Sequence, residues 1–372
     1  EFPNKFRTKG FCSLGKTGSL TVGFVKPSLL SPALVPALTA AFLGASFCAF
    51  AADAPNAGPS GYHLAATWKP GGEGGWDYLS IDPEGRRLYV ARGNRVQVLN
   101  ADTGELTGEV QGVEGAHGIA LAIDLGRGFA SAGRSGKVIV FDLKTLAPIG
   151  APVAVGKKPD AIAYEPTTKH VFAFNGESHD ASVIDAATAQ VIGTVTLDGA
   201  PEFAVADGKG RIYVNLEDKS LLLAINAKSL AVEERWPLAP GKGPTGLSVD
   251  AEKNLLFSGC GNETLVVFDA AAGKVLTTLP IGRGVDATAF DPGTSLAFSS
   301  NGSGTLTVVS DKALPPTVVE NVTTKRSART LAVDPKTHAV YLAAADQTAQ
   351  GGGGGRPGNA PGSFVILKFE KE

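Results

Sequence analysis

The chain has 372 residues and a formal net charge of −2, with 43% hydrophobic and 19% charged residues. This composition can bury a core and excludes an intrinsically disordered chain, and the region after residue 51 has no basic run that would favour nucleic-acid binding. The 47 glycines and 23 prolines favour many short strands joined by tight turns, so we expect an all-β protein.

The first element is an apolar segment over residues 29–50, which carries no charge and follows a basic stretch. This order is typical of a secretory signal peptide, and the small residues at its end form a cleavage site after Ala51. We therefore expect residues 1–51 to be an export signal that includes a non-native leader, and 52–61 to be a flexible linker. The mature protein would be periplasmic or extracellular, without a membrane segment. The alternative is an uncleaved anchor, because 29–51 is just long enough to span a bilayer.

From residue 62 to 369 the chain repeats every 41 to 43 residues. Each repeat opens with an apolar strand that ends in an acidic residue, at positions 82, 124, 165, 207, 250, 291 and 334. Three more strands follow in most repeats; in the first they are 86–92, 95–104 and 105–111. Four short strands at this period are typical of a propeller blade. We predict a single seven-bladed β-propeller over residues 62–369.

The last repeat ends at residue 369 without a fourth strand. The segment 62–68, YHLAATW, is similar to a fourth-strand segment and precedes the first repeat. We expect it to complete the last blade, which closes the ring and leaves no unpaired terminal edge. The same blade carries a Gly/Pro-rich loop at 346–362, for which we predict no regular structure. This loop is either a lid over one face or a tolerated insertion.

Two stretches of these repeats, RRLYVARGNRVQVLNADTGELTGEV and HVFAFNGESHDASVIDAATAQVIGTV, resemble the YVTN-type propeller family, to which the YncE-like secreted proteins belong. The resemblance covers residues 58–369. It implies a secreted seven-bladed propeller without an assigned reaction, and binding roles that in individual relatives include DNA. The chain differs from WD-repeat proteins, because no Trp-Asp pair ends its third strands and Trp76-Asp77 instead opens a first strand.

In a propeller the innermost strands begin around a central channel, where ligands usually bind. Alignment of the repeats places seven side chains at that mouth: Asp77, His117, Asp160, Glu202, Thr245, Asp286 and Arg329. The carboxylates of this ring favour the binding of a cation. The ring is then either a site for a ligand or substrate, or a site for a structural divalent ion. Ca²⁺ is favoured over Zn²⁺, because the ring has one histidine and several carboxylates. The remaining alternative is that Arg329 neutralises neighbouring carboxylates, while the other side chains cap amides at the strand starts or bind channel water.

A second set of side chains follows the second strands and is predicted to share the same face: Arg92, Arg95, Arg134, Asn175, His179 and Asn301. In one interpretation, the three arginines and Arg329 together clamp an anionic ligand. In the other, these side chains belong to ordinary turns and are exposed to solvent. His179 with Asp180, and His117 with a nearby carboxylate, are candidate general-base pairs. No nucleophile, P-loop, dinucleotide or cysteine-pair metal motif accompanies them, so we assign no catalytic residue.

We therefore expect a monomeric, periplasmic or secreted propeller that binds a small molecule, a polymer or a protein at the channel mouth or rim. No cofactor is indicated by a motif, although a divalent cation suits the ring. The alternative is a metal-dependent enzyme of lactonase or dehydrogenase-like type that uses the channel carboxylates and His117. Cys260 follows an apolar strand and is predicted to be a buried, inert thiol.

Overall fold

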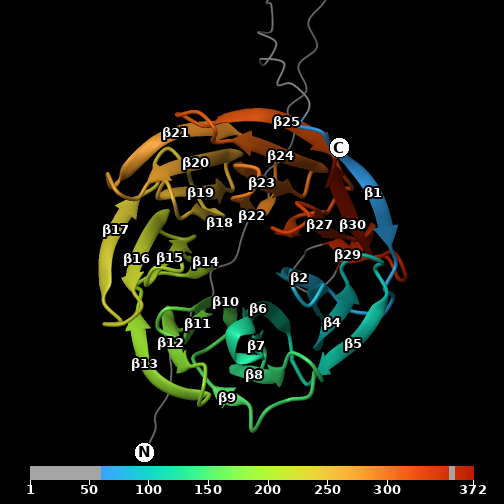
Figure 1. The fold of residues 1–372 in the computed structure, drawn as a ribbon, viewed down its shortest axis with the longest axis vertical. Coiled ribbons are helices and arrows are strands. Elements are labelled where there is room, and N and C mark those ends of the chain that lie inside the picture. Colours follow the sequence, from blue (N-terminus) through green and yellow to red (C-terminus); the bar gives the residue numbers. More distant parts are fainter. Residues whose placement is uncertain (1–59, 352–356) are drawn as a thin grey trace, which may run out of the picture. The chain divides into compact units, whose positions relative to one another are not determined.

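The computed structural model describes residues 60–351 and 357–372. They form seven four-stranded antiparallel sheets around a central axis, which confirms the predicted propeller (Figure 1). The predicted export signal at 1–51 and residues 52–59 of the predicted linker lie outside this part of the chain. The helical content of the described residues is a single 3₁₀ turn, η1 (Ile123–Leu125). No helix among them is long and apolar enough to cross a membrane.

Each blade has an inner strand next to the channel and a second strand paired to it. The inner strands are β2 (Trp76–Asp82), β6 (Ala116–Ala122), β10 (Pro159–Glu165), β14 (Pro201–Ala206), β18 (Pro244–Asp250), β22 (Val285–Asp291) and β26 (Thr330–Val333). The second strands are β3 (Arg87–Arg92), β7 (Arg127–Ala132), β11 (His170–Asn175), β15 (Arg211–Leu216), β19 (Leu255–Cys260), β23 (Leu296–Asn301) and β27 (Val340–Ala344). We number the blades 1 to 7 in this order.

A third and an outer strand complete each blade. The third strands are β4 (Arg95–Asn100), β8 (Lys137–Asp142), β12 (Asp180–Asp185), β16 (Leu221–Asn226), β20 (Thr264–Asp269), β24 (Thr305–Ser310) and β30 (Val365–Lys371). The outer strands are β5 (Leu106–Gln111), β9 (Val153–Ala154), β13 (Gln190–Thr196), β17 (Val232–Pro237), β21 (Lys274–Pro280), β25 (Thr317–Thr323) and β1 (Tyr62–Trp68).

The N-terminal strand β1 is the outer strand of blade 7, as the sequence predicts. It pairs antiparallel with the C-terminal strand β30, from Tyr62 opposite Lys371 to Trp68 opposite Ile366. Figure 1 shows the two ends of the propeller side by side in this blade. The chain also contacts blade 6 just before β1, since the buried Ser60 hydroxyl donates a 2.6 Å hydrogen bond to Glu320 of β25. The ring is therefore closed by backbone pairing between the first and last strands of the propeller.

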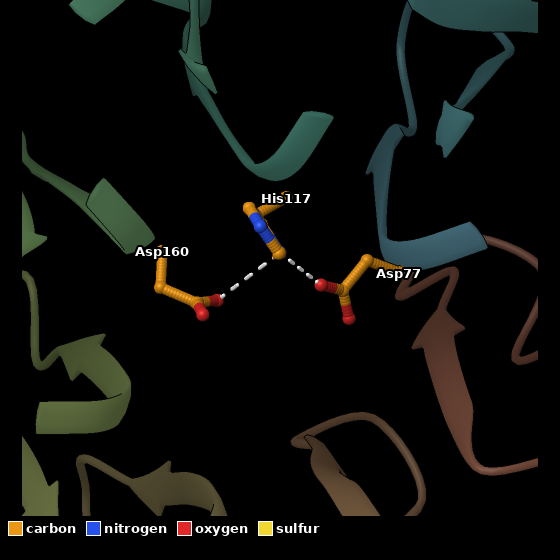
Figure 2. Close-up of side chains that lie close together, drawn as sticks. All are labelled: Asp77, His117 and Asp160. Carbon is orange, nitrogen blue, oxygen red and sulfur yellow. Dashed lines mark hydrogen bonds and ion pairs between the residues drawn. The ribbon is translucent and has the colours of Figure 1, made fainter. Parts of the chain in front are cut away.

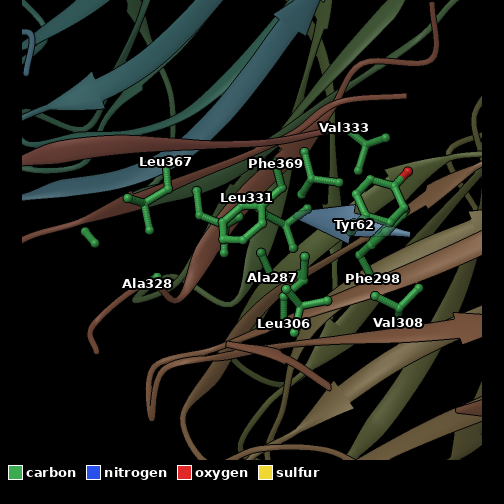
Figure 3. Packing of buried hydrophobic residues seen from close by; sticks show 14 of the residues in the cluster. Tyr62, Ala287, Phe298, Leu306, Val308, Ala328, Leu331, Val333, Leu367 and Phe369 are labelled. Atoms are coloured by element: carbon green, nitrogen blue, oxygen red, sulfur yellow. The ribbon is translucent and has the colours of Figure 1, made fainter. Parts of the chain in front are cut away.

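The hydrophobic core lies between the blades rather than in one central mass. Seven clusters of buried apolar side chains occur in the described residues, and each joins two neighbouring blades. Figure 3 shows the cluster between blades 6 and 7, in which Tyr62 of β1 packs edge-on against Phe298 with ring centroids 5.2 Å apart. The apolar faces of successive sheets thus hold the ring together, and the channel is left for other residues.

The insertion in blade 7 differs from its prediction. It lies between β27 and β30, as expected, but its two arms form the paired strands β28 (Gln347–Gly351) and β29 (Pro357–Asn359). The expectation of no regular structure is therefore wrong for these arms. Glycine and proline are poor strand formers, but an antiparallel hairpin here satisfies backbone groups that a single loop strand would leave to water.

Candidate ligand-binding site at the channel mouth

The inner strands turn the predicted ring residues toward the channel by local irregularities. In six blades the register between the inner and second strands shifts at the ring position, for example between Trp76 and Leu79 around Asp77. In blade 7 the inner strand begins at Thr330, directly after Arg329. A β-bulge redirects one side chain out of the alternating pattern. The repeat therefore supplies the same device at nearly every blade.

All seven predicted ring residues line one cavity of about 350 Å³ at the mouth of the channel. The remaining lining residues are Tyr78, Lys158, Glu217 and Thr330, which the alignment of the repeats does not single out. Five of the lining residues carry carboxyl groups, whereas Lys158 and Arg329 are the only permanent cations among them. The ring predicted from the repeat register is thus brought together in space, including His117 of blade 2.

Asp77, His117 and Asp160 meet at one side of this cavity, from three successive blades (Figure 2). His117 Nδ1 lies 2.5 Å from Asp77 Oδ2 and 3.7 Å from Asp160 Oδ1. One ligand atom from each of the three residues lies within 4.8 Å of the other two. In Figure 2 the two carboxylates approach the imidazole from opposite sides. We call these three residues the Asp-His-Asp cluster.

The His117 ring is held by close packing on its far edge. A Cβ atom at Gly133 would lie 2.6 Å from His117 Cδ2 and 2.8 Å from Nε2, so only glycine leaves room for the ring in this position. The Nε2 edge therefore faces the backbone of blade 2, and Nδ1 faces the two carboxylates. No glycine of the repeat was singled out for this role, because the contact depends on a rotamer and not on periodicity.

The charges of the cavity shift the pKa values of its members. Burial alone would lower the pKa of His117, but the hydrogen bond with Asp77 and the charge of Asp160 raise it above its usual range. Burial, together with the charge of Asp77, raises the pKa of Asp160 to about 6. Burial and the charge of Asp160 raise the pKa of Glu202 to about 8. The site is short of positive charge, and part of the deficit is met by protons.

The charges of Lys158 and Arg329 offset this deficit only in part, since the pKa of Asp160 is still raised to about 6. Arg329 donates from its guanidinium to Asp286, which places it in an ion pair with the neighbouring blade. Thr245, the uncharged member of the ring, is buried and donates a 2.9 Å hydrogen bond to the carbonyl of Val285. Neutralisation by Arg329 thus accounts for Asp286 but not for the Asp-His-Asp cluster.

Tyr78 forms the floor of the charged cavity. Its hydroxyl donates a 2.6 Å hydrogen bond across the channel to the backbone carbonyl of Glu202, and its ring packs against Phe203 with centroids 5.0 Å apart. Tyr78 also lines a second cavity of about 420 Å³, together with Phe203 and many aliphatic side chains. Tyr78 therefore separates the charged mouth from a second cavity whose lining residues are mainly aliphatic.

The predicted rim arginines do not form an anion clamp. Arg92 is 2% exposed, donates to the carbonyls of Gly72 and Gly75, and lies over the Phe364 ring at 4.0 Å. Arg95 is paired with Glu109 at 2.9 Å. Arg92, Arg134 and Arg329 line three separate cavities. The prediction assumed that these side chains converge on one face of the propeller. In the structure, each arginine instead contacts residues of its own blade or of the adjacent blade.

The other predicted rim residues serve local structure. Asn175 is buried and donates to Asp180 at 2.6 Å, and Asn301 is buried and donates to Thr305 and Thr307. The backbone N–H of His179 donates to the carbonyl of Asn175 in a tight turn, and no contact in the described chain joins its imidazole to Asp180. Of the two predicted general-base pairs, only the one with His117 has its members in contact.

Cys260 is fully buried, and burial raises the pKa of its thiol to about 11. It is therefore a packing residue, as predicted. Trp76 and Trp236 are also buried, each 9% exposed, and have a packing role.

Comparison with known proteins identifies the fold. No family model and no curated protein matches the chain. The structure of U3-55K and the crystal structure of the RRP9 WD40 repeats each match with a TM-score of 0.71 and 10% identity, covering 83% and 85% of this chain and 99% of theirs. The Kuenenia stuttgartiensis hydrazine synthase matches with a TM-score of 0.62 and 16% identity over 71% of this chain and 91% of that one. At these identities the chain shares with them the propeller architecture alone.

Proposed function

We propose that this protein is a ligand-binding propeller, and that its ligand is a small cation held at the charged mouth of the channel. The observation that carries the proposal is the convergence of five carboxyl groups on one cavity of about 350 Å³ with only two permanent cations among its lining residues. Concave sites of this size at the mouth of a closed ring are where small ligands usually bind.

Electrostatics give the sign of the ligand. Arg329 is occupied by Asp286, so Lys158 is the one remaining permanent cation opposite four carboxyl groups. The raised pKa values of Asp160 and Glu202 have the same cause, since each carboxyl group is buried beside others of like charge. A bound cation would replace the protons that otherwise relieve this repulsion. An anion would have to overcome it.

We further propose that the chain is a YncE-like, exported, monomeric member of the YVTN-type propellers. This proposal is supported by the repeat segments and by the basic and apolar order of residues 1–51. It places the binding site in the periplasm or outside the cell, where small cations are available to the open channel mouth. No reaction is assigned to the site.

The proposal is tested by thermal unfolding of the full chain in low salt with defined probes: spermidine, choline and arginine as organic cations, Zn²⁺ and Mn²⁺ as divalent ions, and citrate and glucose as controls. A ligand that binds the folded state raises the unfolding midpoint. We expect at least one cation to do so by several degrees, and Glu202→Gln combined with Asp160→Asn to abolish the shift. Glu105→Gln, in an exposed turn, is the matched control. The proposal fails if no cation stabilises the protein, or if the double variant responds like the wild type.

A further inference from the structure

We infer that the Asp-His-Asp cluster is a three-ligand site for a divalent metal ion, in which Asp77, His117 and Asp160 each supply one ligand atom. This inference rests on the proposed function, because it names the cation that the charged mouth would take. The three donor atoms lie within 4.8 Å of one another and come from three different blades. Small adjustments of side chains would bring each of them within bonding distance of one ion.

The orientation of His117 favours coordination over a simple ion pair. The ring packs with its Nε2 edge close to Gly133, so Nδ1 is the nitrogen that faces both carboxylates. Asp77 alone would satisfy that nitrogen at 2.5 Å. Asp160 lies at 3.7 Å, and its carboxylate accepts no hydrogen bond from any residue that the structure describes. A metal ion between the three groups would give Asp160 the partner that the ion pair does not provide.

Thr330 is an independent sign that the cavity takes a polar ligand. It lines the same cavity, is 2% exposed, and its Oγ1 has no hydrogen-bond partner in the described part of the chain. A buried hydroxyl without a partner costs free energy, so a bound ligand or its water shell is expected to supply one. The cluster and Thr330 are thus two separate indications that the same cavity holds a ligand.

The ligand set favours a transition ion over Ca²⁺. Imidazole suits Zn²⁺ and its neighbours in the first transition row, and carboxylates suit Mn²⁺ as well, whereas Ca²⁺ takes six to eight oxygen ligands. Three protein ligands beside an open cavity leave further coordination positions for water or an organic ligand, as in metal sites that bind substrates. The sequence-based preference for Ca²⁺ counted the carboxylates of the whole ring, of which only two belong to the cluster.

The test is metal binding by the full chain, stripped with chelator and then exposed to Zn²⁺ or Mn²⁺ alone. We expect about one ion per chain by elemental analysis after desalting. Asp160→Asn and His117→Gln should each weaken metal binding by at least about tenfold. Mutation of a residue that only hydrogen-bonds to a metal ligand already lowers metal affinity by about 10- to 100-fold. His338→Gln is the matched control, because it removes a histidine from a His-Asp pair of 2.8 Å that does not line the cavity.

Spectroscopy distinguishes the loss of a metal ligand from the loss of folding in a variant. Pulsed EPR of the Mn²⁺-loaded wild type should show coupling to one imidazole nitrogen, and the circular dichroism spectra of all variants should match. Absence of bound metal in the wild type, or equal binding by Asp160→Asn and wild type, would overturn the metal site. If spermidine or choline still stabilises the protein in that case, the proposed cation-binding function stands; if no cation does, both fail.

Discussion

The Ser131 hydroxyl donates a 2.6 Å hydrogen bond to the backbone carbonyl of Asp160, so the second strand of blade 2 fixes the ring residue of blade 3. The same oxygen accepts a 2.7 Å hydrogen bond from the backbone N–H of Gly118, which follows His117. One buried hydroxyl therefore sets the relative position of two members of the Asp-His-Asp cluster. Ser300 repeats the arrangement by donating to the carbonyl of Arg329 in the next blade.

Replacement of Ser131 by alanine should loosen this junction. The N–H of Gly118 and the carbonyl of Asp160 would each lose a buried partner, and an unsatisfied buried group costs about 1–3 kcal/mol. We expect a destabilisation of that order in denaturant unfolding, together with weaker cation binding at the channel mouth. Ser135→Ala is the control, since the Ser135 hydroxyl makes a single 3.4 Å contact, with the Ala132 carbonyl in its own turn. Equal stability of the two variants would contradict the bridging role.

Gly133→Ala should disturb His117 without touching a charge. The new Cβ would overlap the Nε2 edge of the ring, and because Asp77 already lies 2.5 Å from Nδ1 on the other side, the ring would have to leave its present position. The pairing with Asp77 and the charge of Asp160 hold the pKa of His117 above its usual range, so that pKa should fall in the variant. NMR titration of the His117 ring measures it. Gly75→Ala is the control, because no atom lies within 4 Å of a Cβ at Gly75. An unchanged His117 pKa in Gly133→Ala would show that the ring is not held by this contact.

Glu202 should make the protein less stable as the pH rises. Its folded-state pKa is raised to about 8 by burial and by the charges of Asp160, Asp286, Glu217 and Asp77, whereas its ordinary value is 4.5. Between these two pH values the folded chain holds a proton that the unfolded chain has lost. Stability is therefore fully present below pH 4.5 and is lost as the pH rises toward 8.

The Glu202→Gln variant isolates this contribution. It should flatten the fall of stability between pH 5 and pH 8, by roughly 2–4 kcal/mol at most, because one pKa unit corresponds to about 1.4 kcal/mol. Thermal unfolding midpoints measured across this interval test the prediction, with the exposed Glu105→Gln as control. A wild-type profile that rises with pH, or a Gln variant with an unchanged slope, would contradict the assignment.

The repeat period made the fold and the seven ring positions predictable. Equivalent positions in a propeller occupy equivalent places around one axis, so aligning Asp77 with Asp160 and Asp286 in sequence also aligned them in space. The same periodicity says nothing of rotamers or loop paths. It therefore missed the floor formed by Tyr78 and the contact between Gly133 and His117, and it grouped arginines that the structure separates.

The closure of the ring leads to the last prediction, which concerns Tyr62 in β1. Its ring packs against Phe298 of blade 6, and its hydroxyl donates a 2.8 Å hydrogen bond to the carbonyl of His338 in blade 7. Tyr62→Ala should cost about 3–5 kcal/mol, as is usual for loss of a buried aromatic ring, while Tyr62→Phe should cost about 1 kcal/mol for the hydrogen bond alone.

Leu64→Ala, in the same strand and 51% exposed, should be close to neutral. Denaturant unfolding of the three variants separates the packing of β1 from its backbone pairing with β30. Because β1 closes the ring by pairing with the last strand, Tyr62→Ala should also speed proteolysis of β1 ahead of the other blades. Cleavage that begins elsewhere, with Tyr62→Ala no more susceptible than Leu64→Ala, would mean that backbone pairing alone closes the ring.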